Sequence, residues 1–340
     1  MKKIAYILFG IIMISTFIYF HREKTDQTEE LVIYASLMEE QALISAKEFE
    51  RETGIKTKFI RMSSGEILEK IRNEKDNAKA SVWYGGTADT FIDAYQEGLI
   101  EPYISKNSRY IPNRFKSEEG IWTGVYAGIL GFVINEDWFK ENGLEPPKTW
   151  DDLLRPEFEG KIVLPDPRTS GTAYTIISTI IQMKGEKEGF EYLKKLDRQV
   201  VKYTKSGFSP GVVVGMDEAA IGVTFLNNVI RYEKEGYKNL DMILPEDGTG
   251  YEIGSVALLK NSPQTSYGKQ FIDWALTKKA QELGNEVGSY QIFTNVKANS
   301  SMESKLKNLN IIEYDFVWAG KNRKRLIKKF LDISERIAEK

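Results

Sequence analysis

The chain contains no cysteine, and its single histidine, His21, lies close to the N-terminus. Without cysteine there can be no disulfide, no thiolate metal site, no cysteine nucleophile and no lipid-modified cysteine after a leader. Residues beyond 21 cannot supply a histidine base or a histidine metal cluster. The sequence also shows no clustered carboxylate motif, so we expect the protein not to be an enzyme and to need no cofactor or resident metal.

The chain has little excess charge, and this bears on its partners. The net charge is −2, and it becomes −5 once the three positive residues among 1–22 are removed. A mildly acidic body argues against nucleic acid as a partner. Apolar residues make up 41% and charged residues 28% of the sequence, which is typical of globular proteins, and 340 residues suffice for two domains of ordinary size.

The N-terminus looks like a targeting segment. Lys2 and Lys3 precede an apolar run at 4–20, and no small-x-small cleavage site follows that run. The run reaches the shorter end of membrane-spanning lengths. We expect residues 1–22 to be a signal peptide or an N-terminal membrane anchor, with the uncleaved anchor favoured, and 23–30 to be a linker. Either alternative places the body in the periplasm or at the outer face of the cytoplasmic membrane.

Strand and helix patterns alternate along the body. The sequence predicts strands at 31–36, 56–62 and 80–84. Each is followed by a helical pattern, at 39–53, 64–75 and 87–97. Repeated β-α units predict a parallel sheet with right-handed crossovers. A second series begins with a strand at 161–164 and a helix at 173–183. The chain is expected to end in two helical regions, 263–287 and 321–338.

Two apolar segments interrupted by glycine, 124–135 and 251–260, are predicted to be extended crossings between two lobes. They divide the chain into a first lobe of residues 31–128 plus 251–340 and a second lobe of 129–250. The expected fold class is therefore α/β, with two lobes, two crossover strands and a cleft between the lobes. In open α/β sheets, ligands bind at the carboxyl ends of the strands.

Small hydroxyl-bearing residues recur where a predicted strand gives way to a helix. The first N–H groups of a helix have no intrahelical partner, and the helix dipole favours an anion there. Plain N-capping is the alternative explanation for such residues, and Arg168 can either grip an anion or pair with Asp166. The junctions are Ser63-Ser64-Gly65-Glu66, Gly85-Gly86-Thr87, Asp166-Pro167-Arg168-Thr169-Ser170-Gly171-Thr172 and Ser206-Gly207-Phe208-Ser209-Pro210.

Seven stretches, in this order, resemble the type II solute-binding proteins of ABC importers, in the branch that binds ferric iron, phosphonates, thiamine and sugar phosphates. They are LVIYAS at 31–36, WYGGT at 83–87, GVYAGILGFVIN at 124–135, WDDLLRPEFEG at 150–160, DPRTSGT at 166–172, AAIGVT at 219–224 and PEDGTGYE at 245–252. The ending YDFVWAGKNR at 314–323 is similar to members that bind phosphorylated sugars or organophosphates.

The resemblance implies the periplasmic-binding-protein type II fold, whose cleft closes on one small solute and presents it to a membrane permease. We expect a monomer that captures a small anionic solute, phosphorylated or a phosphonate. Dicarboxylates also suit helix N-termini. The residues expected to bind it are Ser36, Ser64, Gly65, Gly86, Thr87, Arg168, Ser170, Gly171, Thr172, Ser206, Gly207 and Glu252.

Two alternative functions stay open at this point. Ferric members of the branch ligate iron with two adjacent tyrosines near the junction that here reads 206–209, whereas Tyr203 stands alone. Carboxylate and phenolate oxygens could still hold a ferric ion. The second alternative is a ligand-sensing component that reports to a membrane histidine kinase, since the same lobes and an uncleaved anchor would serve both roles.

Overall fold

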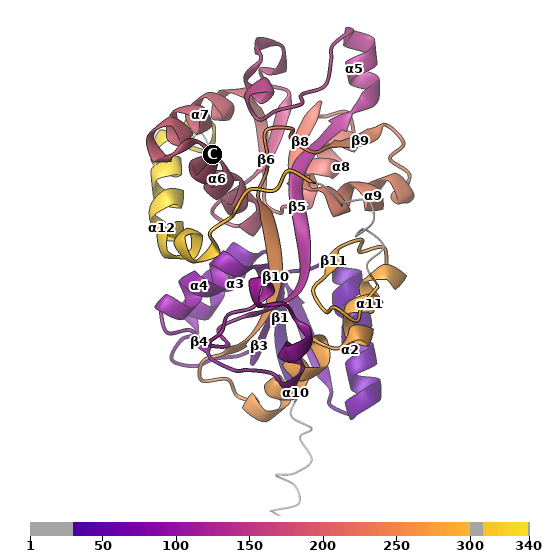
Figure 1. The fold of residues 1–340 in the computed structure, drawn as a ribbon, viewed down its shortest axis with the longest axis vertical. Helices are drawn as coiled ribbons and strands as arrows, with labels where there is room; N and C mark the ends of the chain where they lie inside the picture. Colours follow the sequence, from indigo (N-terminus) through magenta and orange to yellow (C-terminus); the bar gives the residue numbers. More distant parts are fainter. Residues whose placement is uncertain (1–29, 300–308, 339–340) are drawn as a thin grey trace, which may run out of the picture.

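The computed structural model describes residues 30–299 and 309–338, in which strands and helices alternate (Figure 1). The expected targeting segment at 1–22 lies outside these residues, as does all of the expected linker except Glu30. The strands are β1 (Leu31–Ala35), β2 (Thr57–Arg61), β3 (Val82–Thr87), β4 (Ile100–Glu101), β5 (Thr123–Asn135), β6 (Ile162–Pro165), β7 (Val200–Thr204), β8 (Ile221–Phe225), β9 (Leu240–Ile243), β10 (Tyr251–Leu259) and β11 (Ile292–Phe293).

Helices connect most of these strands. The α-helices are α2 (Glu39–Thr53), α3 (Ser64–Asn73), α4 (Ala88–Gln96), α5 (Glu136–Asn142), α6 (Gly171–Lys184), α7 (Glu186–Gln199), α8 (Ser209–Gly215), α9 (Leu226–Glu235), α10 (Thr265–Ala275), α11 (Lys278–Glu286), α12 (Phe316–Ile333) and α13 (Glu335–Ala338). Short 3-10 turns lie at Lys106–Tyr110, Asn113–Phe115, Asp151–Leu154 and Pro156–Phe158.

Two groups of parallel strands are joined by two long antiparallel strands. The order is β2-β1-β3-β10-β5-β8-β6-β7, with β1 parallel to β2 and β3, and β6 parallel to β7 and β8. Strand β5 pairs with β10 over Thr123–Ile129 and with β8 over Leu130–Ile134, so it passes from one group to the other. The predicted α/β class, parallel pairing and long crossings are thus present (Figure 1).

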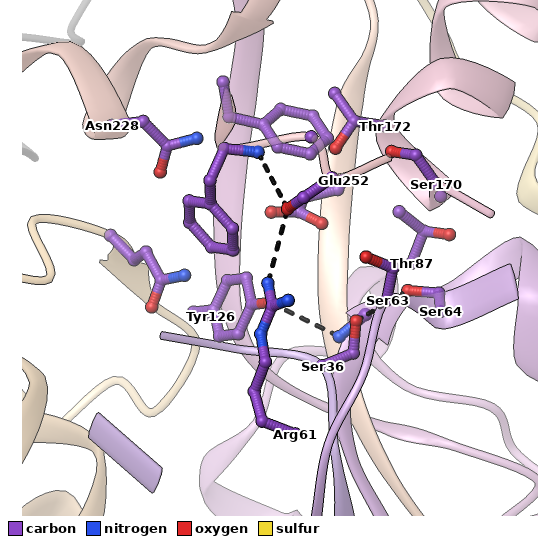
Figure 2. Close-up of a pocket in the computed structure, with 17 residues that line it drawn as sticks. Ser36, Arg61, Ser63, Ser64, Thr87, Tyr126, Ser170, Thr172, Asn228 and Glu252 are labelled. Atoms are coloured by element: carbon purple, nitrogen blue, oxygen red, sulfur yellow. Dashed lines mark hydrogen bonds between the residues drawn. The ribbon is translucent and has the colours of Figure 1, made fainter. Parts of the chain in front are cut away.

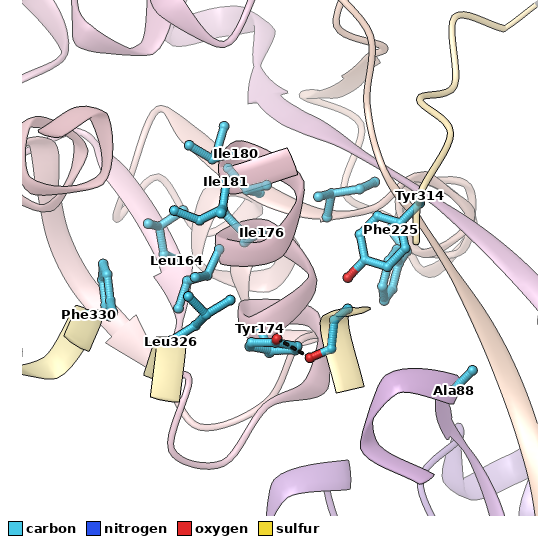
Figure 3. Packing of buried hydrophobic residues seen from close by; sticks show 14 of the residues in the cluster. Ala88, Leu164, Tyr174, Ile176, Ile180, Ile181, Phe225, Tyr314, Leu326 and Phe330 are labelled. Atoms are coloured by element: carbon cyan, nitrogen blue, oxygen red, sulfur yellow. Dashed lines mark hydrogen bonds between the residues drawn. The ribbon is translucent and has the colours of Figure 1, made fainter. Parts of the chain in front are cut away.

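Helix α12 packs against both halves of the molecule, the first half being built on β1, β2 and β3 and the second on β6, β7 and β8. It contacts α4 on one side and α6 and α7 on the other. Gly320 is needed at the α4 contact, because a Cβ there would lie 2.5 Å from Cβ of Ile92. Leu326 and Phe330 share a buried core with Ile176 (Figure 3). The C-terminal segment therefore does not contact the first half alone, and the lobe boundaries expected from the sequence remain a prediction.

The two C-terminal helical regions are each broken where the sequence suggested one helix. The expected helix at 263–287 is split into α10 and α11, and the hydroxyl of Thr277 caps the second by accepting a hydrogen bond from the N–H of Ala280. The expected helix at 321–338 begins earlier, at Phe316, where Asp315 caps it, and it stops at Ser334. Local capping chemistry decides both boundaries, although helical periodicity runs across them.

A buried carboxylate explains the break at Ser334. Asp197, only 1% exposed, accepts hydrogen bonds from the hydroxyl of Ser334 at 2.7 Å, the N–H of Glu335 at 2.8 Å and the hydroxyl of Tyr203 at 2.6 Å. This one carboxylate therefore ties β7 and the start of α13 to α7.

Replacing Asp197 with alanine should lower the free energy of unfolding by roughly 2–4 kcal/mol, because hydrogen bonds to a charged group contribute about 1.5–3 kcal/mol each and buried donors would lose their acceptor. Denaturant unfolding followed by circular dichroism measures this loss. The control is Asp332→Ala, which removes a carboxylate that pairs with Lys328 on the surface and should change stability by less than about 0.5 kcal/mol. Equal stability of the two variants would contradict the role given to Asp197.

Candidate functional site

A polar cavity lies where both groups of parallel strands end (Figure 2). Polar side chains dominate the lining, and they come from both halves of the molecule. The lining residues are Ser36, Arg61, Ser63, Ser64, Gly86, Thr87, Tyr126, Ser170, Gly171, Thr172, Ser206, Gly207, Phe208, Phe225, Asn228, Glu252 and Gln291.

Most of the residues expected to bind ligand meet at this cavity, although they are far apart in the sequence. Ten of the twelve line it, and the other two, Gly65 and Arg168, lie outside the lining. Ligand contact by any of them remains a prediction. The ten are Ser36, Ser64, Gly86, Thr87, Ser170, Gly171, Thr172, Ser206, Gly207 and Glu252.

The two residues outside the lining have structural contacts instead. The N–H of Gly65 donates to the carbonyl oxygen of Thr169 at 2.9 Å, and a Cβ on Gly65 would lie 2.7 Å from that oxygen. Arg168 pairs with Asp166, with its Nε 3.0 Å from both carboxylate oxygens. Of the two alternatives that the sequence allowed for Arg168, the structure shows the pairing with Asp166.

Helix N-termini from both halves face the cavity. Helix α6 begins at Gly171, and the hydroxyl of Ser170 caps it by accepting from the N–H of Ala173 at 3.4 Å. Helix α3 begins at Ser64, whose hydroxyl lies 3.0 Å from that of Ser36, and Thr87 stands at the start of α4. The unpaired N–H groups of these first turns, and the positive ends of the helix dipoles, favour an anion in the cavity.

Two glycines allow close packing around the cavity, Gly171 between the two halves and Gly207 within the second half. A Cβ on Gly171 would lie 3.0 Å from both the Ser64 and the Thr87 hydroxyl oxygens, which belong to the opposite half. A Cβ on Gly207 would lie 2.0 Å from the hydroxyl oxygen of Thr172. Neither position has room for a side chain without a shift of its neighbours.

One acidic side chain, Glu252, faces the cavity among its described lining residues. It is 6% exposed, and no described residue forms an ion pair or hydrogen bond with its carboxyl group. Burial, reinforced by the Asp89 carboxylate, raises the pKa of Glu252 well above its ordinary value. Next to it, the hydroxyl of Tyr126 accepts from the N–H of Gly86 at 3.3 Å. Glu252 can donate as an acid or accept as a carboxylate.

Seven lining residues were not predicted from the sequence. Three of them share the sequence signal of Ser36, which is a position at the carboxyl end of a strand. Arg61, Phe225 and Asn228 lie at or just after such an end. Tyr126 and Gln291 lie within β5 and just before β11, so only the tertiary structure brings them to the cavity. The seven are Arg61, Ser63, Tyr126, Phe208, Phe225, Asn228 and Gln291.

The oxygen ligands expected for a ferric site are not gathered near Tyr203. Its hydroxyl donates to Asp197, and it does not line the cavity. The cavity itself offers one phenol, Tyr126, and one carboxylate, Glu252, among the described residues. Within residues 30–299 and 309–338 there is no group of three or more histidine, aspartate or glutamate side chains placed to hold a metal.

Residues 207–211 read GFSPG, which fits the Gly-x-Ser-x-Gly pattern of serine hydrolases. The local context also fits in part, since Ser209 follows β7 and begins α8. However, Ser209 does not line the cavity, and the only histidine of the chain is His21. The histidine base that activates such a serine is therefore missing from the body of the protein.

Comparison with known proteins assigns the chain to a family. Residues 80–318 match the family model described as bacterial extracellular solute-binding protein. The chain belongs to this family. The periplasmic binding protein AfuA from Actinobacillus pleuropneumoniae, in a structure with exogenous fructose-6-phosphate bound, is 39% identical with a TM-score of 0.86, over 90% of this chain and 98% of that one.

Two further relatives support the assignment. The periplasmic binding protein P5PA is 35% identical with a TM-score of 0.86, over 90% of this chain and 99% of that one. A Haemophilus influenzae protein called uncharacterized is 41% identical over 310 residues, which are 88% of this chain and 89% of its own. The expected type II fold and the expected family of ABC-importer solute-binding proteins are thereby confirmed.

Membership of the family has two consequences. Its members are exported, bind small solutes and work with an ABC permease, so export and a permease partner follow for this chain. Its members are binding proteins, as expected from the sequence. Within the described residues, no helix has the length and apolar character needed to span a membrane.

Replacing Glu252 with glutamine should stabilise the ligand-free protein at pH 7.5. Because the pKa of Glu252 is raised in the folded state, wild-type stability is fully present below the unfolded-state pKa of about 4.3 and is lost as pH rises toward the folded-state pKa. Glutamine removes this loss, which is about 1.4 kcal/mol for each pH unit between the two pKa values.

Denaturant unfolding at pH 4 and pH 7.5 measures the effect of Glu252→Gln. The variant and the wild type should be about equally stable at pH 4, and the variant should be the more stable one at pH 7.5. A gap of the same size at both pH values would show that Glu252 does not titrate between them. The control is Glu246→Gln at an exposed position, which should show no such pH-dependent gap.

Proposed function

We propose that the protein captures a sugar phosphate, or a closely related phosphate monoester, for an ABC importer. The observation that carries the proposal is the convergence of the N-termini of α3, α4 and α6, with their serine and threonine hydroxyls, on one polar cavity. The fructose-6-phosphate bound to AfuA, at 39% identity, supports the same class of solute. A phosphonate is the related alternative, because its anionic group suits the same donors.

In this proposal the two ends of the ligand meet different groups. The phosphate lies at the first turns of α6 and α3, where Ser170, Gly171 and Thr172 face Ser36 and Ser64. The sugar hydroxyls extend toward the remaining polar lining. There Glu252 can accept from a hydroxyl group. The amide of Asn228 donates to the hydroxyl of Thr224 at 3.0 Å and accepts from the amide of Asn227 at 3.1 Å, so its second N–H is left for the ligand.

Contacts between the two halves hold the cavity closed. Lys205 pairs with Glu66 at 2.6 Å, and Arg231 pairs with Glu40 at 3.1 Å. These pairs are exposed, and exposed ion pairs contribute little on their own. We infer that ligand shifts the balance between open and closed forms by binding both halves at once, to the extent that it prefers the closed form.

We further propose that the monomeric protein stays tethered to the membrane by residues 4–20, because no small-x-small cleavage site follows this apolar run. Mass spectrometry of the protein purified from the native host should then find the uncleaved N-terminus in the membrane fraction. A mature N-terminus between residues 14 and 27, in a soluble fraction, would refute the tether and leave the solute-binding proposal untouched.

A thermal-shift screen of the full-length protein in detergent tests the class of solute. The panel contains hexose phosphates, phosphonates, thiamine forms and ferric citrate. A hexose phosphate at about 100 times its dissociation constant should stabilise the folded state by about 2.7 kcal/mol. Stabilisation by ferric citrate alone, with a red charge-transfer band, would refute the proposal in favour of a ferric carrier. Neighbouring genes for a histidine kinase would favour the sensor alternative.

Replacing Thr172 with valine should weaken binding of the selected hexose phosphate about 10-fold or more. A hydrogen bond to a charged group contributes roughly 1.5–3 kcal/mol, and each 1.4 kcal/mol corresponds to tenfold in affinity. Stability should change little, because Ser170 still caps α6. Calorimetric titration with parallel unfolding curves measures both quantities. Unchanged affinity would show that Thr172 serves only as scaffold.

The variants Gly171→Asp and Gly171→Asn test whether the ligand's negative charge lies at the start of α6. Both side chains crowd Ser64 and Thr87 equally, so the difference between them reports charge alone. The Gly171→Asp variant should bind the hexose phosphate more weakly than the Gly171→Asn variant, since the added carboxylate repels the phosphate. If the anion lies elsewhere, the two variants should bind alike, and aspartate should be equal or slightly more stable through the helix dipole.

A further inference from the structure

Arg61 is the one positively charged side chain among the described residues that line the cavity. It is the last residue of β2 and is half-buried. Figure 2 shows its side chain reaching from the end of the strand into the cavity, between Tyr126 and Ser36. A full positive charge therefore faces the same space as the helix N-termini.

The guanidinium of Arg61 forms no ion pair with a described residue. The carboxylate of Glu66 interacts with its charge only from beyond ion-pair distance, whereas Arg168 is held by Asp166 at 2.5 Å. Its two hydrogen bonds are long, since Nε lies 3.4 Å from the carbonyl oxygen of Leu37 and Nη2 lies 3.4 Å from the hydroxyl oxygen of Ser206. A guanidinium carries five N–H donors in a planar fork, so most of its capacity is available to a ligand.

The charge of the ligand decides whether this arrangement is favourable. Each helix N-terminus presents about half a positive charge, and Arg61 adds a whole one, so the empty cavity concentrates positive potential. A monoanion can be held by helix N-termini alone. A phosphate monoester carries close to two negative charges above pH 7, and Arg–phosphate contacts are often bidentate.

We propose that Arg61 is a specificity-determining residue that binds the second negative charge of the ligand and thereby selects dianionic phosphate monoesters over monoanionic esters. The inference rests on the proposed function and deepens it, because it states why a phosphate ester is preferred to a sulfate ester of the same sugar. The sequence pattern does not single out this residue.

A purely structural role is the competing explanation. Arg61 comes from the first half of the molecule, and its contacts with Ser206 and with the ring of Phe208, 5.5 Å from the guanidinium carbon, belong to the second half. Such contacts could simply hold the halves together. Lys205 provides the matched control, because it also bridges the halves, through Glu66 at 2.6 Å, but does not line the cavity.

The two explanations predict different responses to ligand charge. The full-length protein in detergent is titrated calorimetrically at pH 8 with fructose 6-phosphate and with fructose 6-sulfate, which share the sugar and differ in ester charge. The wild type should prefer the phosphate by about 10-fold or more. Arg61→Gln should bind the phosphate at least about 10-fold more weakly and the sulfate only slightly more weakly, so the preference is lost.

The variants Arg61→Lys and Lys205→Gln complete the test. Lysine keeps the charge without the planar fork, so it should retain part of the preference for phosphate and shows that position 61 tolerates substitution. Lys205→Gln should weaken both ligands by the same small factor and leave the preference intact. Unfolding curves for each variant confirm that it is folded.

Three results would overturn the inference, and they differ in what they imply for the proposed function. If Arg61→Gln weakens phosphate and sulfate by the same factor, as Lys205→Gln does, Arg61 only holds the halves together, and the proposed function stands. If the wild type binds fructose 6-phosphate tightly but does not distinguish it from the sulfate, no residue binds the second negative charge selectively, and the inference alone fails. Absence of binding of both esters to the wild type would overturn the proposed function and this inference together.

Discussion

The convergence of positively polarised helix ends on one small cavity is the constraint on which the site depends. Helices α3, α4 and α6 come from different parts of the chain, yet their first turns face one space because both groups of parallel strands end there. Like partial charges brought together are unfavourable without an anion. The glycine at 171 follows from this, since a side chain there would keep the two halves apart.

Charged residues that do not line the cavity also hold the surrounding helices in place. The hydroxyl of Thr87 donates to the carboxylate of Asp89 at 3.0 Å, and Arg323 of α12 lies 3.9 Å from the same carboxylate and over the ring of Tyr174. Burial raises the pKa of Asp89 to about 6, although Arg323 and the neighbouring threonine hydroxyls act in the opposite direction. This cluster links the starts of α4 and α6 to the C-terminal helix, so α12 helps to position both anion-facing turns.

The sequence predicts the strand-to-helix junctions well because the signal is local. A strand that ends in small hydroxyl residues before a helix must bring those residues to the sheet edge, so Ser64 and Thr172 could be placed without a structure. Gly65 and Arg168 share the same local signal, but their contacts with Thr169 and Asp166 depend on how the loop packs. Tyr126 could not be found in this way, because its position depends on the pairing of β5 with β10.

Arg61 and Glu252 make the cavity selective for how the polar groups of a ligand are arranged. The two residues carry opposite charges in their ionised forms, both face the cavity, and neither forms an ion pair with any described residue, including the other. If they neutralised each other, the preference of the cavity for anions would rest on the helix N-termini alone. Held apart, they suit a ligand whose own groups are separated in the same way, with an anionic group at Arg61 and a hydrogen-bond donor at Glu252. Inorganic phosphate carries its hydroxyl donor on the anion itself, whereas a phosphate ester of a sugar also carries hydroxyl groups away from the phosphate. Burial raises the pKa of Glu252, and this reduces the repulsion that its carboxylate would impose on an anionic ligand.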